Sequence, residues 1–336
     1  MQKTSIDWFA FRGKSSLDVF ASAFEVGMPE HLGVYLEPLG RGYRSFESSF
    51  DVWAFDRDKG PDPASRLRIG RAMTGGDLVK GWSLLSITGA GCSWVEDWSK
   101  VMDACQEKVA SFELKRVDVA LDRFDGSHWE DVDEAWRAGE FSPPGGGKWP
   151  KVKVIDTRRD EDGRSYYVGS RDSAKFYRGY EKGLQMLGPE LARAGSEDEV
   201  LSVLQTRKAR ISEDRKSACL VKLADWWRDE VEFKPVNQPL PLDLVENRDG
   251  YFSGAYPYLA KVLPSVEAAP LITRRERMPQ VDLAKALAQV RKQYGSTLYT
   301  ALRAYHGDIG AVWDKVCGVS HSRALVDAGV LMVEHE

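Results

Sequence analysis

Three short segments, in which charged and apolar residues alternate, constrain the fold of this chain most strongly. They are R-V-D-V-A-L-D at 116–122, Y-Y-V-G-S-R-D-S-A-K-F-Y-R-G-Y-E-K at 166–182 and W-R-D-E-V-E-F-K at 227–234. Successive side chains of a strand point to opposite faces of a sheet. Each segment therefore predicts a strand with one polar and one apolar face.

The same alternation predicts which side chains share a polar face. They are Arg116, Asp118 and Asp122 in the first segment, Arg178, Tyr180 and Lys182 in the second, and Arg228, Glu230, Glu232 and Lys234 in the third. If the strands are neighbours in one sheet, this face gathers carboxylates, cations and a tyrosine. Those groups are the components of a metal-assisted phosphoryl-transfer site with a covalent tyrosine nucleophile.

Tyr180 is the candidate nucleophile. A neutral phenol, with a pKa of about 10, attacks poorly, so nearby cations or a base must favour its ionised form. Arg178 and Lys182 lie two positions to either side of Tyr180 and fit that need. Tyr177 falls on the opposite face of an ideal strand and is the competing nucleophile. The alternative is that Tyr180 is a half-buried tyrosine of the sheet without a catalytic role.

Asp118, Asp122 and Glu230 are the candidate metal ligands. Carboxylate oxygens suit Mg²⁺ or Mn²⁺. Asp118 and Asp122 are separated by roughly 13 Å along a regular strand, so one of them with a carboxylate of another strand forms the more plausible site. The alternative is a ladder of salt bridges between strands, with Arg116 paired to Glu230 or Arg228 paired to Asp118.

Charge is distributed unevenly along the chain. The formal net charge of −4 gives no overall signal for nucleic-acid binding, but residues 148–182 carry ten Lys and Arg against six Asp and Glu. Further cations follow at 207–222. The candidate DNA contacts are Arg171, Lys175, Arg116 and Arg228. Trp94, Trp98 and Trp149 could stack on unpaired bases if they are exposed.

Other site classes find little support. The four cysteines are scattered, and the five histidines are isolated, with no metal-binding spacing among them. G-A-G-C at 89–92 lacks the ending of a phosphate-binding loop. The sequence has no apolar run long enough to cross a membrane and no signal peptide at its start. These features predict a reduced protein of the cytoplasm.

The overall pattern predicts an α+β fold, with a central, mainly antiparallel sheet flanked by helices and a smaller helical domain near the C-terminus. Helices are expected at 17–26, 94–109, 128–139, 189–210 and 281–294. Gly169–Ser173 supplies the turn of a hairpin over 163–182. The predicted boundaries are a nicking-joining domain at 1–236, a linker at 237–254 and a helical domain at 255–336. The sequence shows no internal repeat.

Five pieces of the chain, in order, resemble the replication initiation factor family, the rolling-circle initiators of filamentous phages and small Gram-positive plasmids. They are I-D-W-F-A-F near the start, S-I-T-G-A-G-C at 86–92, R-V-D-V-A-L-D-R-F-D-G at 116–126, Y-Y-V-G-S-R-D-S-A-K-F-Y-R-G-Y-E-K-G at 166–183 and W-R-D-E-V-E-F-K at 227–234. Together they cover roughly residues 5–236, and the phage branch looks closest. Gly179 departs from the family pattern, which has an apolar residue there.

The resemblance implies a metal-dependent enzyme that nicks one strand of a double-stranded origin, also binds single-stranded DNA, and later rejoins the displaced strand. It would hold the 5′-phosphate on the tyrosine that matches Tyr180 and leave a 3′-hydroxyl for the host polymerase. The matching acidic positions are Asp118, Asp122 and Glu230. A host replicative helicase and a second copy of the chain are further implied partners. A relaxase that nicks a transfer origin, or an origin-binding regulator that does not cut, are the alternatives.

Overall fold

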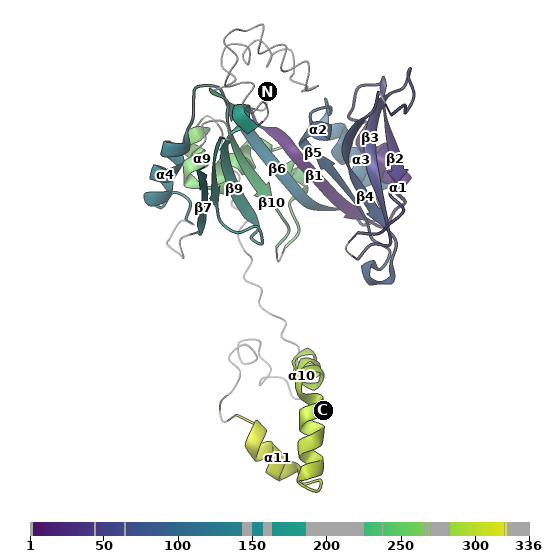
Figure 1. The fold of residues 1–336 in the computed structure, drawn as a ribbon, viewed down its shortest axis with the longest axis vertical. Helices are drawn as coiled ribbons and strands as arrows, with labels where there is room; N and C mark the ends of the chain where they lie inside the picture. The colour runs from purple at the N-terminus through teal and green to yellow at the C-terminus, as the bar shows by residue number, and fades with distance from the viewer. Residues whose placement is uncertain are drawn as a thin grey trace. The chain divides into compact units, whose positions relative to one another are not determined.

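The computed structural model describes residues 3–142 except 44 and 64, 150–156, 163–185, 225–264 except 237, 266, 268, 283–318 and 320. The chain divides into two compact units, Met1–Thr273 and Arg274–Glu336. The first unit contains a large sheet, and the described part of the second contains two helices (Figure 1).

A ten-stranded sheet organises the first unit, in the order β2-β3-β4-β5-β1-β6-β10-β9-β8-β7. Every pair of neighbours is antiparallel. The strands are β1 (Ser5–Gly13), β2 (Leu32–Pro38), β3 (Ser48–Asp56), β4 (Leu67–Thr74), β5 (Ser83–Thr88), β6 (Glu113–Arg123), β7 (Val152–Asp156), β8 (Arg164–Val168), β9 (Lys175–Glu181) and β10 (Trp227–Phe233). The predicted α+β class with a central antiparallel sheet is confirmed.

The two halves of the sheet follow the same path. In the first half β1 is followed by a helix, and β2 to β5 then return to it in the outward order β1-β5-β4-β3-β2. In the second half β6 is followed by a helix, and the outward order is β6-β10-β9-β8-β7. The halves meet where β1 pairs with β6. The sequence does not reveal this repeat, because the order of the strands is repeated and the amino-acid sequence is not.

Helices cover the apolar face of both halves (Figure 1). Among its described residues, the first unit contains the helices α1 (Leu17–Glu25), α2 (Gly89–Cys92), α3 (Trp98–Lys108), α4 (Trp129–Arg137), α8 (Arg248–Ala255) and α9 (Pro257–Val262), with short 3-10 turns at Asp77–Val79 and Leu242–Leu244. Phe11 of β1 stacks on Phe20 of α1, and Trp98 of α3 meets Phe9 edge-on. In the second half Trp129 of α4 packs edge-on against Tyr166.

The second unit contains α10 (Leu283–Ala304) and α11 (Ile309–Val316). A turn joins them at His306 and Gly307, both of which have positive φ. Asp308 begins α11 by accepting a hydrogen bond from the backbone N–H of Ala311 at 3.0 Å. Within the described part of the chain, no helix is both long and apolar enough to cross a membrane.

The predicted linker at 237–254 is wrong, because this stretch packs into the first unit. Leu244 and Phe252 are fully buried, and so is Leu259 of the next helix. The Asp249 carboxylate accepts hydrogen bonds from the backbone N–H groups of Lys3 and Thr4, both at 2.8 Å. The boundary therefore falls at Thr273, well after the predicted 236. Proline-rich composition suggested a linker, but buried apolar side chains decide the packing.

Most of the expected elements are present, with local differences. The helices expected at 17–26, 94–109 and 128–139 correspond to α1, α3 and α4. Strands β4 and β7 were not expected from the sequence. The helix expected at 189–210 and the cations at 207–222 lie outside the described residues.

Phe252→Ala should lower the free energy of unfolding of the first unit by about 3–5 kcal/mol, because it leaves a cavity in a close-packed core. Urea unfolding followed by circular dichroism would measure the change. Trp313→Ala, in α11, is the control, since that side chain is 61% exposed and its loss should change little. Equal stability of the two variants would restore the linker interpretation.

Candidate active site

The three strands that carry the candidate residues are neighbours at the centre of the sheet. Strand β10 lies between β6 and β9. In the register of these strands, Glu232 faces Asp118, Arg228 faces both Asp122 and Tyr180, and Glu230 faces Arg178. The polar residues expected on one face of the sheet are therefore adjacent, as the alternation predicted.

Arg178 joins two buried carboxylates of this face. Its Nη2 lies 2.7 Å from Asp118 Oδ2 and also contacts Glu230 Oε1. Both acidic residues are only 1% exposed. On its other side Asp118 accepts a hydrogen bond from Arg116 Nε at 2.8 Å, and Arg116 also pairs with Glu232 at 3.0 Å. Charges buried this deeply require such partners.

Arg228 organises a second group of carboxylates on the same face. Its Nε and Nη2 donate to the two oxygens of Asp122 at 2.6 and 2.8 Å, and its Nη1 pairs with Asp7 at 2.6 Å. Trp226 Nε1 also donates to Asp122, at 2.8 Å. The expected salt-bridge ladder exists, but its partners differ from the pairs Arg116–Glu230 and Arg228–Asp118.

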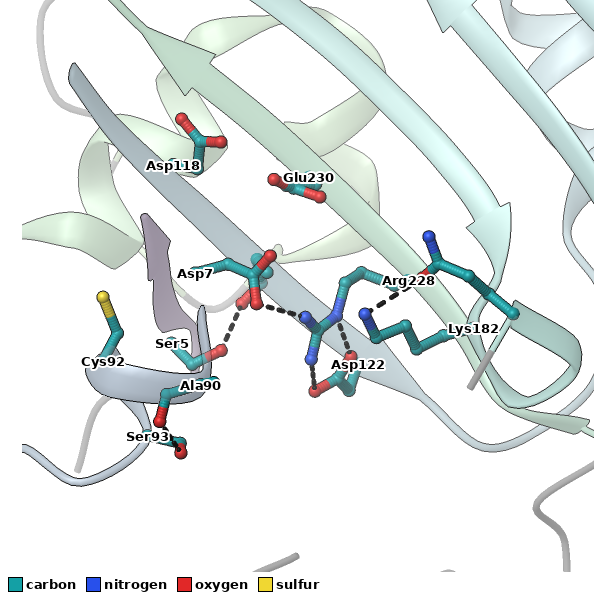
Figure 2. A network of polar contacts seen from close by, with 12 residues as sticks. Ser5, Asp7, Ala90, Cys92, Ser93, Asp118, Asp122, Lys182, Arg228 and Glu230 are labelled. Carbon is teal, nitrogen blue, oxygen red and sulfur yellow. Dashed lines mark hydrogen bonds and ion pairs between the residues drawn. The ribbon is translucent and has the colours of Figure 1, made fainter. Parts of the chain in front are cut away.

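Asp7 belongs to this site, although the sequence reasoning missed it. In an ideal strand it would share the core face with Phe9, but the pairing of β1 with β6 shifts register between Ile6 and Trp8. Figure 2 shows its carboxylate between Arg228 and the region of Asp118 and Glu230. Gly89 makes room for it, since a Cβ there would lie 2.5 Å from Asp7 Oδ1. The sequence did contain a signal for Asp7, because an acidic residue is unusual at a position where the alternation predicts a core-facing side chain.

Tyr180 shares this face with Glu230. Its hydroxyl donates to Glu230 Oε2 at 3.1 Å, and the residue is 8% exposed. Burial raises the pKa of Tyr180 well above its usual 10, and the charge of Glu230 adds to this effect. Burial, together with the charge of Asp7, raises the pKa of Glu230 from 4.5 to about 8. The phenol is therefore protonated and hydrogen-bonded to a carboxylate that takes up protons near neutral pH.

The expected action of the cations on Tyr180 is only partly correct. Arg178 and Arg228 do lower the pKa of the phenol, but burial and Glu230 outweigh them. Lys182 Nζ lies 5.4 Å from the centre of the Tyr180 ring and donates to Gln185 Oε1 at 3.1 Å. The hydroxyl of Tyr180 therefore has a carboxylate, Glu230, as its hydrogen-bond partner, while the nearby cations have the smaller effect on its pKa.

Tyr177 lies on the opposite, helix-covered face. It is fully buried, and its hydroxyl donates to Asp229 Oδ1 at 2.6 Å. Asp229 also pairs with Arg123 at 2.7 Å, and Arg123 donates to the Tyr258 hydroxyl at 3.1 Å. Burial and the Asp229 charge raise the pKa of Tyr177 well above its usual value. This tyrosine links the sheet to α9.

The same arrangement explains Gly179. A Cβ at this position would lie 2.4 Å from the Tyr177 hydroxyl and 2.7 Å from Cζ2 of Trp227. Any larger residue would displace one of these two groups. The departure from the family pattern is therefore coupled to the packing of Tyr177 and leaves the alternation along β9 intact.

The candidate DNA contacts lie in different environments. Arg171 is exposed in the turn before β9, with its guanidinium 6.0 Å from the centre of the Phe176 ring. Lys175 lies on the face of Tyr177, donates to the backbone oxygen of Ala255, and has its pKa lowered to about 8 by burial. Arg116 and Arg228 are engaged by the carboxylates described above.

The predicted metal ligands do not form one cluster. Asp118 and Glu230 meet through Arg178, whereas Asp122 is held by Arg228. Among the described residues, no three His, Cys, Asp or Glu side chains gather closely enough to hold an ion. Mg²⁺ in proteins uses one or two carboxylates together with substrate phosphates and water. The pair Asp118 and Glu230 matches that smaller requirement.

The three tryptophans considered for base stacking lie in different environments. Trp98 packs in the core against Phe9 and Phe24, Trp94 is half-buried, and Trp149 lies outside the described residues.

Residues 112–193 match the model of a family described as replication initiation factor. The family resemblance is confirmed. The matched segment includes Asp118, Asp122 and Tyr180, whereas Glu230 lies beyond it. Among solved structures, the rolling circle replication initiator protein from Geobacillus stearothermophilus is 14% identical, with 82% of this chain and 91% of that chain covered and a TM-score of 0.45. None of the curated proteins compared matches this chain.

Gly179→Ala should destabilise the protein by about 1–3 kcal/mol, because the added methyl group overpacks the core beside Tyr177. In a Tyr177→Phe background the cost should shrink, since the nearest obstructing atom is the hydroxyl. Thermal unfolding of the single and double variants would measure this coupling. Gly318→Ala is the control, with nothing within 4 Å of the added atom. Strict additivity would contradict the proposed contact.

Glu230→Gln should change how stability depends on pH. A carboxyl whose pKa is raised on folding contributes stability below its unfolded value, and this contribution is lost as pH rises through its folded value. For Glu230 that window runs from 4.5 to about 8. The variant should therefore match the wild type near the lower limit and melt at a higher temperature above the upper one. Melting curves that stay parallel across the window would refute the assignment.

Proposed function

We propose that this protein initiates rolling-circle DNA replication by nicking one strand of a double-stranded origin. The observation that carries the proposal is the hydrogen bond from Tyr180 to Glu230, on a strand segment that matches the replication initiation factor family. An acyl or glycosyl site would need other partners, whereas a tyrosine beside a proton acceptor and an arginine suits phosphoryl transfer.

The chemistry assigns a separate task to each residue. The Tyr180 oxygen attacks the phosphorus of the scissile bond while its proton passes to Glu230 Oε2. The bond from phosphorus to the 3′-oxygen breaks, and this oxygen leaves as a 3′-hydroxyl after taking a proton from water. The 5′-phosphate stays on Tyr180 as an ester. Arg178, which already contacts Glu230, would stabilise negative charge on the transferring phosphate.

A divalent ion, Mg²⁺ or Mn²⁺, is part of the proposal, with Asp118 and Glu230 as its protein ligands. When bound, it would act as a Lewis acid toward the phosphate oxygen. Asp122 would instead hold Arg228, as its two hydrogen bonds indicate. Arg171 remains the exposed candidate for a backbone phosphate contact.

The remaining implications of the family are predictions of the same proposal. The 3′-hydroxyl would prime a host polymerase, a host helicase would open the duplex, and the ester would allow the displaced strand to be rejoined. A filamentous-phage origin, a homodimer and a cytoplasmic location also stay predictions. A relaxase acting on a transfer origin would use the same chemistry.

One observation favours a second candidate function. All three predicted metal ligands are engaged by arginines in this structure. In an origin-binding regulator that does not cut DNA, these carboxylates would serve only to form salt bridges within the sheet. Nicking of supercoiled origin plasmid with Mg²⁺, with Mn²⁺ and with excess EDTA separates the two functions. Open circles that form only with an ion support the enzyme, and cutting that persists in EDTA would remove the metal from the proposal.

Tyr180→Phe should abolish the covalent protein–DNA adduct while keeping the fold, because it removes one hydroxyl and leaves the ring in place. Mass spectrometry of a trapped conjugate with a single-stranded origin oligonucleotide would locate the bond. Tyr177→Phe is the matched control, since it removes a hydroxyl on the other face of the same strand and should leave the adduct intact. An adduct on Tyr177, or on no tyrosine, would refute the assignment.

A further inference from the structure

A row of aromatic and cationic side chains leads along strand β1 away from the candidate active site. Trp8, Ala10 and Arg12 share the polar face of the sheet, because Trp8 lies directly opposite Asp118 and Ala10 directly opposite Arg116. The small side chain of Ala10 separates the two larger ones. From Trp8 to Arg12 the row extends roughly 13 Å at the usual rise of a strand.

Both ends of this row are built from a cation stacked on a tryptophan. The Arg116 guanidinium lies 4.4 Å from the centre of the Trp8 ring. At the far end the Arg12 guanidinium lies 4.1 Å, and Lys14 Nζ 5.4 Å, from the centre of the Trp82 ring. Trp8 and Trp82 are both half-buried rather than enclosed in the core. We refer to Trp8, Arg116, Arg12, Lys14 and Trp82 as the β1 track.

The far end of the β1 track is locally positive in a chain whose net charge is −4. Arg12 and Lys14 lie there, and Lys115 is nearby. Burial lowers the pKa of the Lys115 ammonium group, and the positive charge of Arg12 lowers it further. The carboxylate of Glu113 forms a salt bridge with Arg12, with Oε2 of Glu113 2.7 Å from Nη2 of Arg12. That pair is about one-third exposed, so a phosphate could replace Glu113 at little cost.

We propose that the β1 track binds single-stranded DNA beside the nicked phosphodiester. The inference rests on the proposed function, since it supposes that the scissile phosphate lies near Tyr180 and Asp118. Aromatic rings stack on bases of any sequence, and interleaved cations hold the backbone; together they are the usual features of a single-strand site. A paired duplex keeps its base faces covered, so the track selects DNA that is already melted or extruded.

The test is an equilibrium binding measurement with the full chain carrying Tyr180→Phe, so that no strand is cut. The probe is a fluorescein-labelled oligothymidylate of 12 nucleotides, titrated in EDTA by fluorescence anisotropy. Adding Trp82→Ala should weaken binding at least about fivefold, through loss of one stacked base. Adding Arg12→Ala and Lys14→Ala together should lower the salt dependence of log K by about 0.7 for each lost phosphate contact.

Arg66→Ala is the matched control. Arg66 stacks on Trp53 with its guanidinium 4.3 Å from the ring centre, and it lies just before β4, away from the β1 track. Its loss should leave oligothymidylate binding unchanged. Trp82→Phe should recover most of the affinity lost in Trp82→Ala, which a general loss of folding would not allow. A blunt duplex of the same length should bind the Trp82→Ala protein and its parent equally.

Three outcomes would overturn the proposal. They are unchanged oligothymidylate binding by Trp82→Ala, an equal loss on single-stranded and duplex DNA, and a loss as large in Arg66→Ala. These results are independent of nicking. A protein that never cuts plasmid but loses oligothymidylate binding in Trp82→Ala would refute the proposed enzyme and keep the β1 track as a binding site for single-stranded DNA.

Discussion

The rest of this structure depends on the pairing of buried charge across the central strands β6, β10 and β9. Asp118, Glu230 and Glu232 are at most 4% exposed, and unpaired carboxylates at that depth would be prohibitively costly. Arg178 and Arg116 compensate them, and Arg228 does the same for Asp122 and Asp7. This compensation also fixes the strand register, because a slip of one residue would send each charge into the helix-covered core. The groups proposed for catalysis are therefore the groups that align the sheet.

The two faces of β9 show how one strand serves two purposes. On the polar face Tyr180 meets Glu230, and on the apolar face Tyr177 meets Asp229 beneath α9. Both phenols donate to a carboxylate and both have a raised pKa, so the pKa alone does not distinguish them. What differs is their surroundings. Asp229 pairs with Arg123 on the helix-covered face, whereas Glu230, which Arg178 contacts on the polar face, has its pKa raised to about 8 by burial and the charge of Asp7.

The sequence predicted those parts of the fold that depend on local alternation. The polar faces of β6, β9 and β10 follow from period-two spacing, which can be recognised in the sequence of each strand without knowledge of its neighbours. Asp7 was missed because a register shift in β1 breaks that spacing, and such a shift depends on the partner strand. The linker at 237–254 was wrong for a related reason, since Leu244 and Phe252 become core residues only where they pack against the rest of the first unit. The ion-pair partners of Arg116 and Arg228 also differ from the predicted ones, because the sequence alone does not give the positions of neighbouring strands relative to one another.

The ion pair between Asp7 and Arg228 joins residues 221 positions apart in the chain. Contacts over such distances form late, because the intervening chain must first be ordered. During synthesis the first half of the sheet could assemble from its own hairpins, yet its Asp7 would lack a cation until β10 had left the ribosome. A nascent or truncated chain that lacks β10 would carry Tyr180 without Glu230, the carboxylate that accepts its hydrogen bond.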